Sequence, residues 1–256
     1  MKYIIFDLDD TLLNDNRQVS PYTQQVLKRL QAMGHILAIN TARSRAFSQE
    51  YIDIIGPDYA ILNGGALILN RAGETVFQAE IDAETTRAVI AELLEMTDNI
   101  SVQTADSFYS HMGYYKGQNA KEIDFSREYF GFSAQKIIAS LEEEQKVAAV
   151  AEKFSLQYTT YFSGTFRRFS HRNATKALGN RNLVELLGGD LQDVIAFGDD
   201  WGDMQMLREA GVGVLMKNAK LHLHEAGLHL SEYTNDEDGV ARFLAKYFAL
   251  PEEKEE

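Results

Sequence analysis

The sequence predicts a doubly wound, mostly parallel α/β core into which a second, α+β domain is inserted. Near both ends of the 256-residue chain, short continuous apolar runs alternate with helical patterns, which is typical of parallel strands covered by helices on both faces. In the middle of the chain, polar and apolar residues alternate instead, which indicates an antiparallel sheet with one solvated face. We therefore expect a core formed by residues 1–81 and 170–256, and an inserted domain formed by residues 82–169.

Each apolar run of the predicted core stops at a polar residue, which marks the end of a strand. Runs this short, bounded in this way, favour strands that are buried on both faces. The predicted strands are Tyr3–Phe6, Ile36–Ile39, Tyr59–Leu62, Val194–Phe197 and Gly213–Leu215.

The helical patterns between these runs have recognisable ends. Ser20 can cap a helix that has Pro21 in its first turn and ends at Gly34. Its inward stripe is Val26, Leu27, Leu30 and Met33. Another helix begins near Asp203 and stops at Gly211. Both patterns fit helices that connect parallel strands.

The predicted inserted domain combines helices with several shorter strands. Its helical patterns cover Thr85–Met96 and Glu142–Phe154. Its strands are predicted at Ile100–Gln103, Phe108–His111, Lys136–Leu141, Gln157–Phe162 and Thr165–Phe169. We expect the last pair of strands to form a hairpin around Ser163-Gly164.

Composition excludes several classes of protein. The chain has 38 acidic and 25 basic residues, a formal net charge of −13 and no cysteine. This balance argues against a nucleic-acid binder, and the lack of cysteine excludes disulfides and thiolate metal sites. An acid as early as Asp7 argues against a signal peptide, and no apolar run approaches the ~20 residues of a membrane span. We expect a cytoplasmic protein that binds neither nucleic acid nor membrane.

A strongly acidic chain accepts an anionic substrate only where a metal ion or a cluster of cations supplies positive potential. Ligands of open α/β sheets bind at the carboxyl ends of the strands, where the polar residues that end the apolar runs converge. Asp7 and Asp9 end the first run and can face the same side. Asp7 can attack a phosphoryl group, and Asp9 can transfer protons to and from the reacting oxygens. The simpler alternative for this pair is an acidic turn or a helix cap.

The other polar residues expected at this edge have both a catalytic and a structural interpretation. Asp199 and Asp203 are spaced to bind a hard cation such as Mg²⁺, or to cap a helix. Thr41 can donate to a phosphoryl oxygen, or cap a helix. Lys176 can neutralise phosphate charge, or lie in solvent. Crowding these aspartates with Asp7 and Asp9 would be strongly repulsive without a cation, so their convergence favours a metal site.

The order of these residues resembles the haloacid dehalogenase superfamily. The shared pattern is Asp-x-Asp-x-Thr from Asp7, a Thr after an apolar run, a Lys, and Gly-Asp-x-x-x-Asp from Gly198. The segments Ile61–Ala66, Val214–Ala219 and Asn235–Ala241 are similar to further signatures of its Cof-type subfamily. The resemblance implies a Rossmann-like core with a C2-type cap domain, and a Mg²⁺-dependent phosphatase that forms an aspartyl-phosphate.

The resemblance also implies a role for each matching residue. Asp7 would be the nucleophile and a metal ligand, and Asp9 the general acid/base, which binds the metal through its backbone carbonyl. Asp199 would ligate Mg²⁺, with Asp203 ligating it or orienting its waters. The residues implied to hold the phosphoryl group are Thr41, Lys176 and Asn218, the last as a support for the phosphate or the lysine.

Some positions depart from the family pattern or extend it. Gly202 stands where these proteins commonly carry Asn before the last Asp. Asp10 and Ala42 stand where a small residue or Gly is usual. Candidates for contact with the rest of the substrate are Arg43, Asn63 and Arg167. The alternatives are a tight turn for Asn63-Gly64 and a surface side chain for Arg167.

The residues and the resemblance predict a Mg²⁺-dependent phosphatase. Its partner would be a small phosphorylated metabolite, such as a sugar phosphate or a phosphorylated cofactor. The alternatives are a phosphomutase, which transfers the phosphoryl group to another sugar hydroxyl, and a non-catalytic phospho-accepting or binding protein. The sequence does not indicate the oligomeric state.

Overall fold

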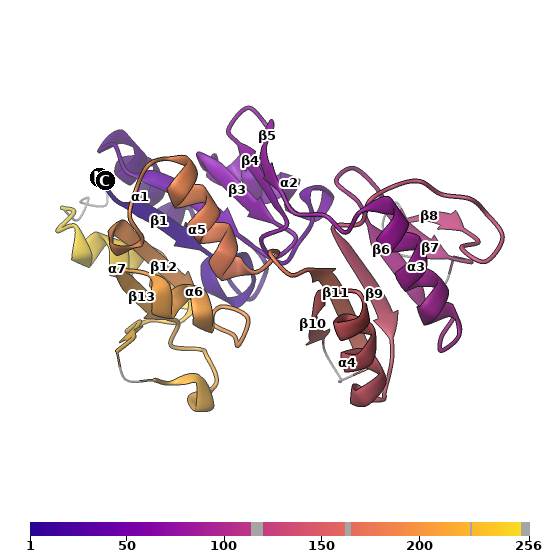
Figure 1. Cartoon of the computed structure of the whole chain (residues 1–256). Helices are drawn as coiled ribbons and strands as arrows, with labels where there is room; N and C mark the ends of the chain where they lie inside the picture. The colour runs from indigo at the N-terminus through magenta and orange to yellow at the C-terminus, as the bar shows by residue number, and fades with distance from the viewer. Residues whose placement is uncertain (114–119, 162–164, 226, 252–256) are drawn as a thin grey trace. The chain divides into compact units, whose positions relative to one another are not determined.

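The computed structural model describes residues 1–113, 120–161, 165–225 and 227–251 (Figure 1). The contacts divide the chain into two compact units. The core unit comprises Met1–Arg43, Phe47–Phe77 and Lys176–Glu256, and the insert unit comprises Ser44–Ala46 and Gln78–Thr175. The sequence predicted that the inserted domain covers residues 82–169. The inserted segment Gln78–Thr175 is therefore longer at both ends than predicted.

In the described part of the core unit, eight strands form one sheet in the order β14-β13-β12-β1-β2-β3-β4-β5. They are β1 (Tyr3–Phe6), β2 (Ile36–Asn40), β3 (Tyr59–Leu62), β4 (Leu67–Asn70), β5 (Thr75–Gln78), β12 (Val194–Gly198), β13 (Val212–Leu215) and β14 (His229–Leu230). The pairs from β14 across to β3 are parallel, and β3 pairs with β4 in the antiparallel sense. The predicted doubly wound, mostly parallel core is confirmed, with β4, β5 and β14 added to the predicted strands.

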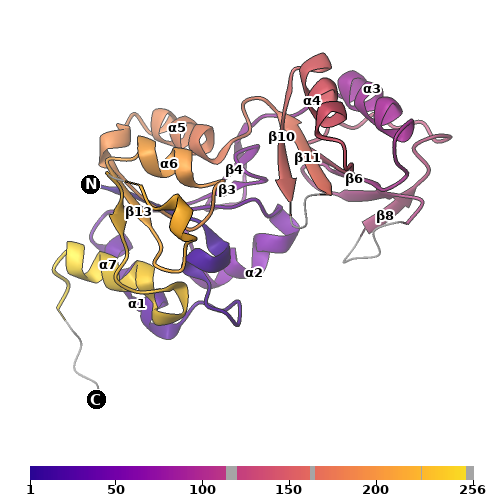
Figure 2. The same ribbon diagram turned by 90° about the horizontal axis from the view of Figure 1, so that it is seen from below.

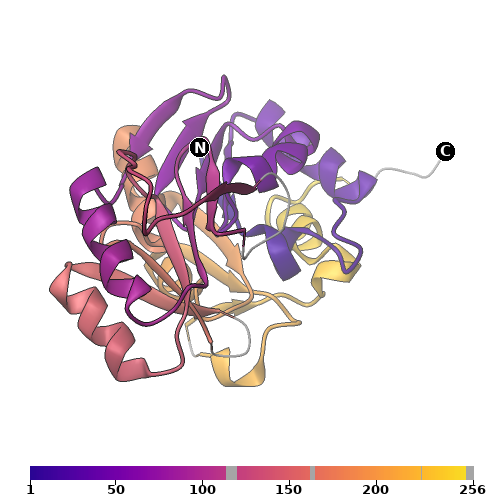
Figure 3. The ribbon, with the colours of Figure 1, turned by 90° about the vertical axis from the view of Figure 1, so that its right-hand side faces the viewer.

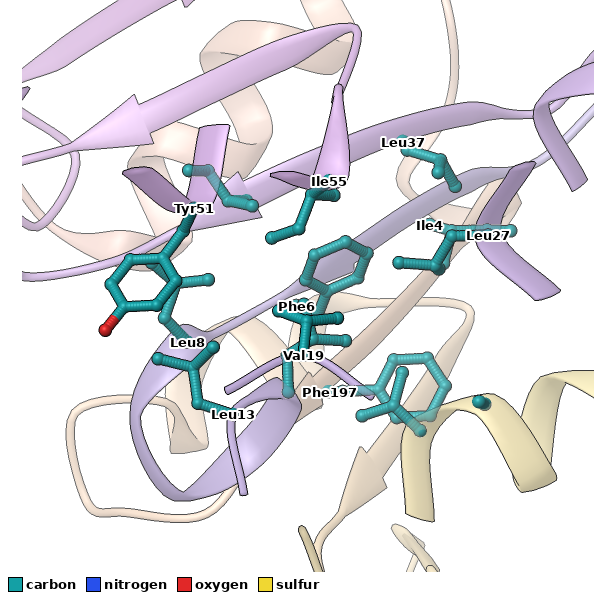
Figure 4. Packing of buried hydrophobic residues seen from close by; sticks show 14 of the residues in the cluster. Ile4, Phe6, Leu8, Leu13, Val19, Leu27, Leu37, Tyr51, Ile55 and Phe197 are labelled. Carbon is teal, nitrogen blue, oxygen red and sulfur yellow. The ribbon is translucent and has the colours of Figure 1, made fainter. Parts of the chain in front are cut away.

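Helices cover both faces of this sheet (Figure 2). They are α1 (Pro21–Ala32), α2 (Arg45–Ile55), α5 (Lys176–Leu186), α6 (Met204–Glu209) and α7 (Gly239–Tyr247). Phe6 of β1 packs in one hydrophobic cluster with α1, α2 and α7, whereas its neighbour Ile5 packs in another with α5 and α6. Figure 4 shows part of the first cluster, including Phe6, Leu27 and Ile55. Burial of β1 on both faces is what its continuous apolar run predicted.

Local signals place the ends of the helices in the core unit. Ser20 caps α1, since its Oγ accepts from the Thr23 N–H at 3.0 Å. Gly34 follows the helix with a φ of +84°, a conformation that glycine adopts without strain. α6 begins directly after Asp203, as predicted. Short 3₁₀ turns cover Leu191–Asp193, Leu221–Leu223 and Asn235–Glu237.

The described residues of the insert unit form a six-stranded sheet in the order β10-β11-β9-β6-β7-β8. Its strands are β6 (Ile100–Gln103), β7 (Phe108–His111), β8 (Ala120–Ile123), β9 (Lys136–Ser140), β10 (Leu156–Tyr161) and β11 (Phe166–His171). Paired strands are antiparallel except for β7 and β8, which are parallel. The predicted hairpin is the pair β10 and β11, and its turn at residues 162–164 lies outside the described residues.

The helices of the insert unit, α3 (Ala83–Leu94) and α4 (Glu144–Lys153), lie side by side on one face of this sheet (Figure 3). Their apolar residues pack on Val102, Ile137 and Phe169. The opposite face is polar, as the alternation predicted, but its residues Ser101 and Gln103 are buried. The prediction of a solvated face is wrong for these residues. Alternation of polar and apolar residues shows which face of a sheet is polar, but polar groups that are hydrogen-bonded can still be buried.

Within the described part of the chain, none of the helices combines the length and the apolar character that crossing a bilayer demands. The cytoplasmic location stays a prediction.

Candidate active site

Polar residues follow neighbouring parallel strands at the carboxyl edge of the core sheet. Asp7 follows β1, Thr41 follows β2 and Asp199 follows β12, and these strands are adjacent. The backbone pairing continues past the strand ends. The Asp7 N–H donates to the Phe197 carbonyl at 3.1 Å, and the Thr41 N–H donates to the Ile61 carbonyl at 2.9 Å. The fold therefore brings to one edge the residues that end the apolar runs.

Lys176 lies between two buried carboxylates at this edge. It is the first residue of α5, and its Nζ lies 2.9 Å from Asp7 Oδ2 and 2.5 Å from Asp203 Oδ1. The Lys176 side chain is only 9% exposed. Burial lowers the pKa of Lys176, but the charges of Asp203 and Asp7 raise it by more, so the net pKa is raised. An ammonium group held beside Asp7 can neutralise a phosphoryl group that binds there.

Asp203 is fully buried, and both of its carboxylate oxygens have partners in the protein. Oδ1 binds Lys176, while Oδ2 accepts from the N–H groups of Asp199 and Asp200 at 3.2 Å each. Gly198 makes room for this side chain, because a Cβ at that position would lie 2.4 Å from the Asp203 Cβ. The arrangement indicates that Asp203 positions Lys176 and the loop that carries Asp199.

The acidic side chains of this edge fit a metal ion. Among the described residues, Asp7, Asp199 and Asp203 each offer a carboxylate oxygen within 4.8 Å of the others. Burial, with the charge of Asp203, raises the pKa of Asp199 to about 7, although Thr11 Oγ1 donates to it at 3.0 Å. Burial also raises the pKa of Asp7, against the opposing charge of Lys176. A divalent cation relieves this crowding of carboxylates, and Mg²⁺ prefers oxygen ligands.

Asp9 is held by Arg43, for which the sequence predicted a contact with substrate. Arg43 Nε and Nη2 donate to the carboxylate oxygens of Asp9 at 2.8 and 2.5 Å. The guanidinium carbon lies 4.8 Å from the centre of the Tyr51 ring. Burial raises the pKa of Asp9, but the hydrogen bonds and charge of Arg43 outweigh it, so the net pKa is lowered. In this structure, Arg43 is a positioning residue for Asp9.

The Asn63-Gly64 turn braces the loop that carries Thr41. Asn63 and Gly64 have φ values of 53° and 66° and begin the connection between β3 and β4, which covers residues 63–66. The Gly65 N–H donates to the Leu62 carbonyl at 3.1 Å, and positive φ at both central residues of such a turn is what Asn-Gly favours. The Asn63 N–H donates to the Arg43 carbonyl at 2.8 Å, and the Gly64 N–H donates to the Thr41 carbonyl at 2.9 Å. Thr41 itself is buried, and its Oγ1 accepts from the Arg43 N–H at 3.2 Å. The turn therefore fixes the backbone at the end of β2.

Asn218 braces the loop that follows Asp9. Its Nδ2 donates to the Asp10 carbonyl at 2.7 Å, and its Oδ1 accepts from the Asn235 N–H at 3.0 Å. The predicted support for the phosphate or for Lys176 stays a prediction. The contacts in this structure connect Asn218 to the first acidic loop and to the C-terminal motif instead.

Asn40 contacts the start of α5, which the sequence did not reveal. Its Nδ2 donates to the Lys176 carbonyl at 2.8 Å and to Asn180 Oδ1 at 2.7 Å. Because Asn40 ends β2 and Lys176 begins α5, these bonds set the start of the helix beside the strand. The signal in the sequence is a polar residue that ends an apolar run, but it does not identify the partner.

A pocket of about 400 Å³ adjoins Asp199 in the core unit. Its lining includes Asp10, Trp201, Asn218 and His222. Trp201 is 71% exposed. Gly202, the departure from the family pattern, donates its N–H to Asp200 Oδ1 at 2.6 Å and so closes the turn before Asp203.

Arg167 lies in the insert unit, and its guanidinium is bound there. It donates to the Leu141 carbonyl at 3.1 Å and to Thr160 Oγ1, and it lies 3.2 Å from a carboxylate oxygen of Glu144. Only 6% of its side chain is exposed. These contacts give Arg167 a structural role in joining β11 to the start of α4, so we do not include it in the proposed site.

The comparisons with known proteins are consistent with one another. Residues 4–244 match the haloacid dehalogenase-like hydrolase family. A Haemophilus influenzae protein named "Putative phosphatase" is 30% identical, with 96% of this chain and 98% of that protein covered. A 5-amino-6-(5-phospho-D-ribitylamino)uracil phosphatase of Bacillus subtilis is 25% identical, with 96% and 97% covered. A haloacid dehalogenase-like hydrolase structure from Bacteroides thetaiotaomicron is 21% identical, with a TM-score of 0.80 and with 96% and 99% covered.

Proposed function

We propose that this chain, which belongs to the haloacid dehalogenase-like hydrolase family, is a Mg²⁺-dependent phosphatase of small phosphorylated metabolites. The family match confirms the family and the hydrolase class predicted from the sequence. The phosphatase names of the two curated relatives support phosphate esters as the substrates. The observation that carries the proposal is the buried contact of Lys176 with Asp7 and Asp203, beside Asp199.

In the first half of the proposed reaction, Asp7 attacks the phosphorus atom. A bond forms between a carboxylate oxygen and phosphorus, while the bond from phosphorus to the leaving oxygen breaks. Lys176, which already contacts Asp7, offsets the repulsion between the nucleophile and the anionic phosphoryl group. Thr41 would donate to a phosphoryl oxygen from the end of β2. A bound Mg²⁺, held by the carboxylates of Asp7 and Asp199, would neutralise further phosphoryl charge.

Asp9 carries the proton in both halves of the proposed reaction. It protonates the leaving oxygen while the aspartyl-phosphate forms, and it then takes a proton from the water that hydrolyses this intermediate. Arg43 fixes both oxygens of Asp9 and lowers its pKa. The ionised carboxylate suits the second half, and the protonated form that the first half needs is the scarcer one.

The test is phosphate release from a panel of phosphorylated metabolites, with Mg²⁺ and with a chelator. We expect the wild type to turn over only with the metal, and Asp7→Asn to be inactive. Asp53→Asn is the control, because Asp53 is an exposed acid of α2 that is not part of the candidate site, and it should keep most of the activity. Turnover that survives in Asp7→Asn, or that chelation does not change, would contradict the mechanism.

The same experiment separates the alternatives. A phosphomutase would convert its substrate without accumulating inorganic phosphate. A phospho-accepting protein would keep a stable phosphate on Asp7 without release. The B. subtilis relative acts on a phosphorylated ribitylamino-uracil by its name, so phosphorylated cofactors and their precursors belong in the panel beside sugar phosphates.

A further inference from the structure

Another pocket of the core unit shares no residue with the candidate active site. Its volume is about 330 Å³. It lies between α7 and the segment that begins with β14, which is the edge strand of the described core sheet. Both elements line it, with Tyr233 among the residues of the segment and Tyr247 among those of the helix. A pocket of this volume can hold a small molecule, and the proposed reaction does not use it.

Aromatic rings form much of the lining of this pocket. They belong to His229, Tyr233, Phe243 and Tyr247. The rings of Phe243 and Tyr247 are stacked, with 6.1 Å between their centres and 15° between their planes. The His229 ring meets Phe243 edge-on, also at 6.1 Å. Tyr233 and Tyr247 are 37% and 45% exposed, so they offer flat apolar surface to the ring of a ligand.

Arg242 also lines the pocket, and neutral groups hold its guanidinium in place. The guanidinium carbon lies 4.8 Å from the centre of the Tyr233 ring and 5.7 Å from the centre of the Tyr22 ring. The Nε donates to the Glu237 carbonyl at 2.8 Å. Among the described residues, the contacts of this guanidinium are therefore with rings and a backbone carbonyl rather than with a carboxylate. Stacking and the Nε bond fix its plane, and the Nη groups are the donors that a planar oxyanion can bind.

The charge on the rest of the lining decides which kind of anion fits. Lys246 Nζ lies 2.5 Å from Glu232 Oε1, so these two side chains neutralise each other. Arg242 is then left to supply a single positive charge. One positive charge matches a carboxylate, whereas a phosphate monoester carries ~1.5–2 negative charges at pH 7. The lining therefore favours a carboxylate.

We propose that this pocket binds a small aromatic carboxylate. The ring of the ligand lies against Phe243 and Tyr247, and its carboxylate accepts hydrogen bonds from the Nη groups of Arg242. The contact between a guanidinium and a carboxylate is directional and stronger than a contact between neutral groups. In a chain with a net charge of −13, an anion needs such a local cation to bind. The pocket takes no part in the proposed phosphatase reaction, so the two proposals can fail separately.

The first test is calorimetric titration of the full chain with indole-3-acetate, with a chelator present so that no metal ion binds the carboxylate. Indole-3-acetamide is the neutral probe of the same shape, and acetate is the anion without a ring. We expect indole-3-acetate to bind about tenfold or more tightly than either, since it alone uses both the rings and Arg242. Absence of binding, or an affinity no higher than that of the amide or of acetate, would overturn the proposal.

Variants of Arg242 test the charged half of the pocket. Arg242→Met keeps an apolar stem without the charge, so it should bind indole-3-acetate no more tightly than the amide. Arg242→Lys keeps the charge without the planar fork and should have intermediate affinity. Arg172→Met is the matched control, because Arg172 is an exposed arginine outside the pocket. Equal affinity for indole-3-acetate in Arg242→Met and Arg172→Met would show that the proposal is wrong.

Tyr247→Ser tests the aromatic half. Indole-3-acetate and its amide both lose the same stacking surface in this variant, so we expect each to bind about fivefold more weakly than to the wild type. The preference for the carboxylate over the amide should stay, because Arg242 is unchanged. Wild-type affinity for both probes in Tyr247→Ser would contradict the proposed position of the ring.

Thermal unfolding with and without indole-3-acetate separates loss of the site from loss of the fold. A ligand that binds the folded chain raises its Tm. The proposal predicts this rise in the wild type and in Arg172→Met, and a much smaller rise in Arg242→Met. The same rise in all three proteins would contradict it. A chain without any phosphatase turnover would leave these binding tests intact.

Discussion

Lys176 in the core unit and Lys136 in the insert unit are both buried lysines, but their surroundings have opposite charge. Lys176 contacts Asp7 and Asp203, and its pKa is raised. Lys136 lies near Arg168, and its pKa is lowered to about 7. Burial acts in the same direction on both side chains, so the neighbours decide the outcome.

The difference explains what each lysine can do. Lys176 holds its charge through partners that the protein itself supplies, so it is a permanent part of the site that receives the phosphoryl group. Lys136 is buried near another cation, Arg168, whose charge disfavours the charged form of the lysine. The charged form of the same residue type is therefore favoured by its neighbours in one unit and disfavoured in the other.

Removing Lys176 should have the largest effect. In Lys176→Met, Asp7 and Asp203 stay buried without their cation, so we expect a loss of ~3–5 kcal/mol in the free energy of unfolding, measured by urea denaturation without metal. Turnover should fall by about a thousandfold or more, because the phosphoryl group loses its charge partner. Lys28→Met, at an exposed lysine of α1, is the matched control. A Lys176→Met protein as stable and active as this control would refute the role of the cluster.

Metal binding should depend steeply on pH because of Asp199. Its pKa of about 7 lies above the ordinary value, so a proton competes with Mg²⁺ below pH 7. We expect the apparent affinity to rise by about tenfold per pH unit up to that point and then to level off. Trp201, the one tryptophan of the chain, follows Asp200 directly and can report binding by fluorescence. Asp199→Asn should bind the metal weakly and lose this pH dependence. A wild-type affinity that does not change between about pH 5.5 and about pH 7 would contradict the assignment of Asp199 as a metal ligand.

Arg43→Met should have a smaller effect, and mainly on the pH profile. Without Arg43, the pKa of Asp9 rises toward that of an ordinary or buried carboxyl group. A general acid must be protonated, so its activity is lost as the pH rises through its pKa. In the profile of activity against pH, the alkaline limb that reflects the ionisation of Asp9 should therefore move to higher pH in the variant. We expect kcat to change by about tenfold at most. A limb that stays in place would show that Arg43 does not set the pKa of Asp9.

The smallest effect should be a pH-dependent gain of stability in Lys136→Met. Between the lowered pKa of about 7 and the ordinary value of 10.5, the unfolded chain binds a proton that the folded chain has lost. The free energy of unfolding of the wild type therefore rises with pH across this window. Below it, the full cost of burying the charged Lys136 applies. We expect the variant to be ~1–2 kcal/mol more stable at low pH, and the gap to close as the pH rises. A wild type that is the more stable protein below the window would contradict this account.

The sequence was informative where one strong pattern decides the structure. Continuous apolar runs predicted β1, β2, β3, β12 and β13, because strands buried on both faces need no polar alternation. It missed β14, which has two residues, and β8, whose Ala-Lys-Glu-Ile has little apolar content. Such strands form because a neighbouring edge pairs with them, and that information is not local.

The same contrast between local and non-local information holds for the site residues. Asp7, Thr41 and Asp199 could be grouped from the sequence because each follows a strand. The pairing of Arg43 with Asp9 and of Asn40 with Lys176 depends on which loops become neighbours, which no spacing reveals. Arg167 shares a sheet face with Phe169, two residues on, so period-two alternation could have assigned it to the helix-covered face.

The central claim is that Asp7 is the nucleophile, and chemical trapping of the intermediate tests it most directly. Enzyme mixed with substrate and Mg²⁺ is quenched in acid within one turnover and reduced with borohydride, which converts an aspartyl-phosphate to homoserine. Peptide mass spectrometry should find homoserine at position 7 in the wild type, in an amount that follows the burst of product, and none in Asp7→Asn. Homoserine at another aspartate, or steady turnover with none at position 7, would contradict the account.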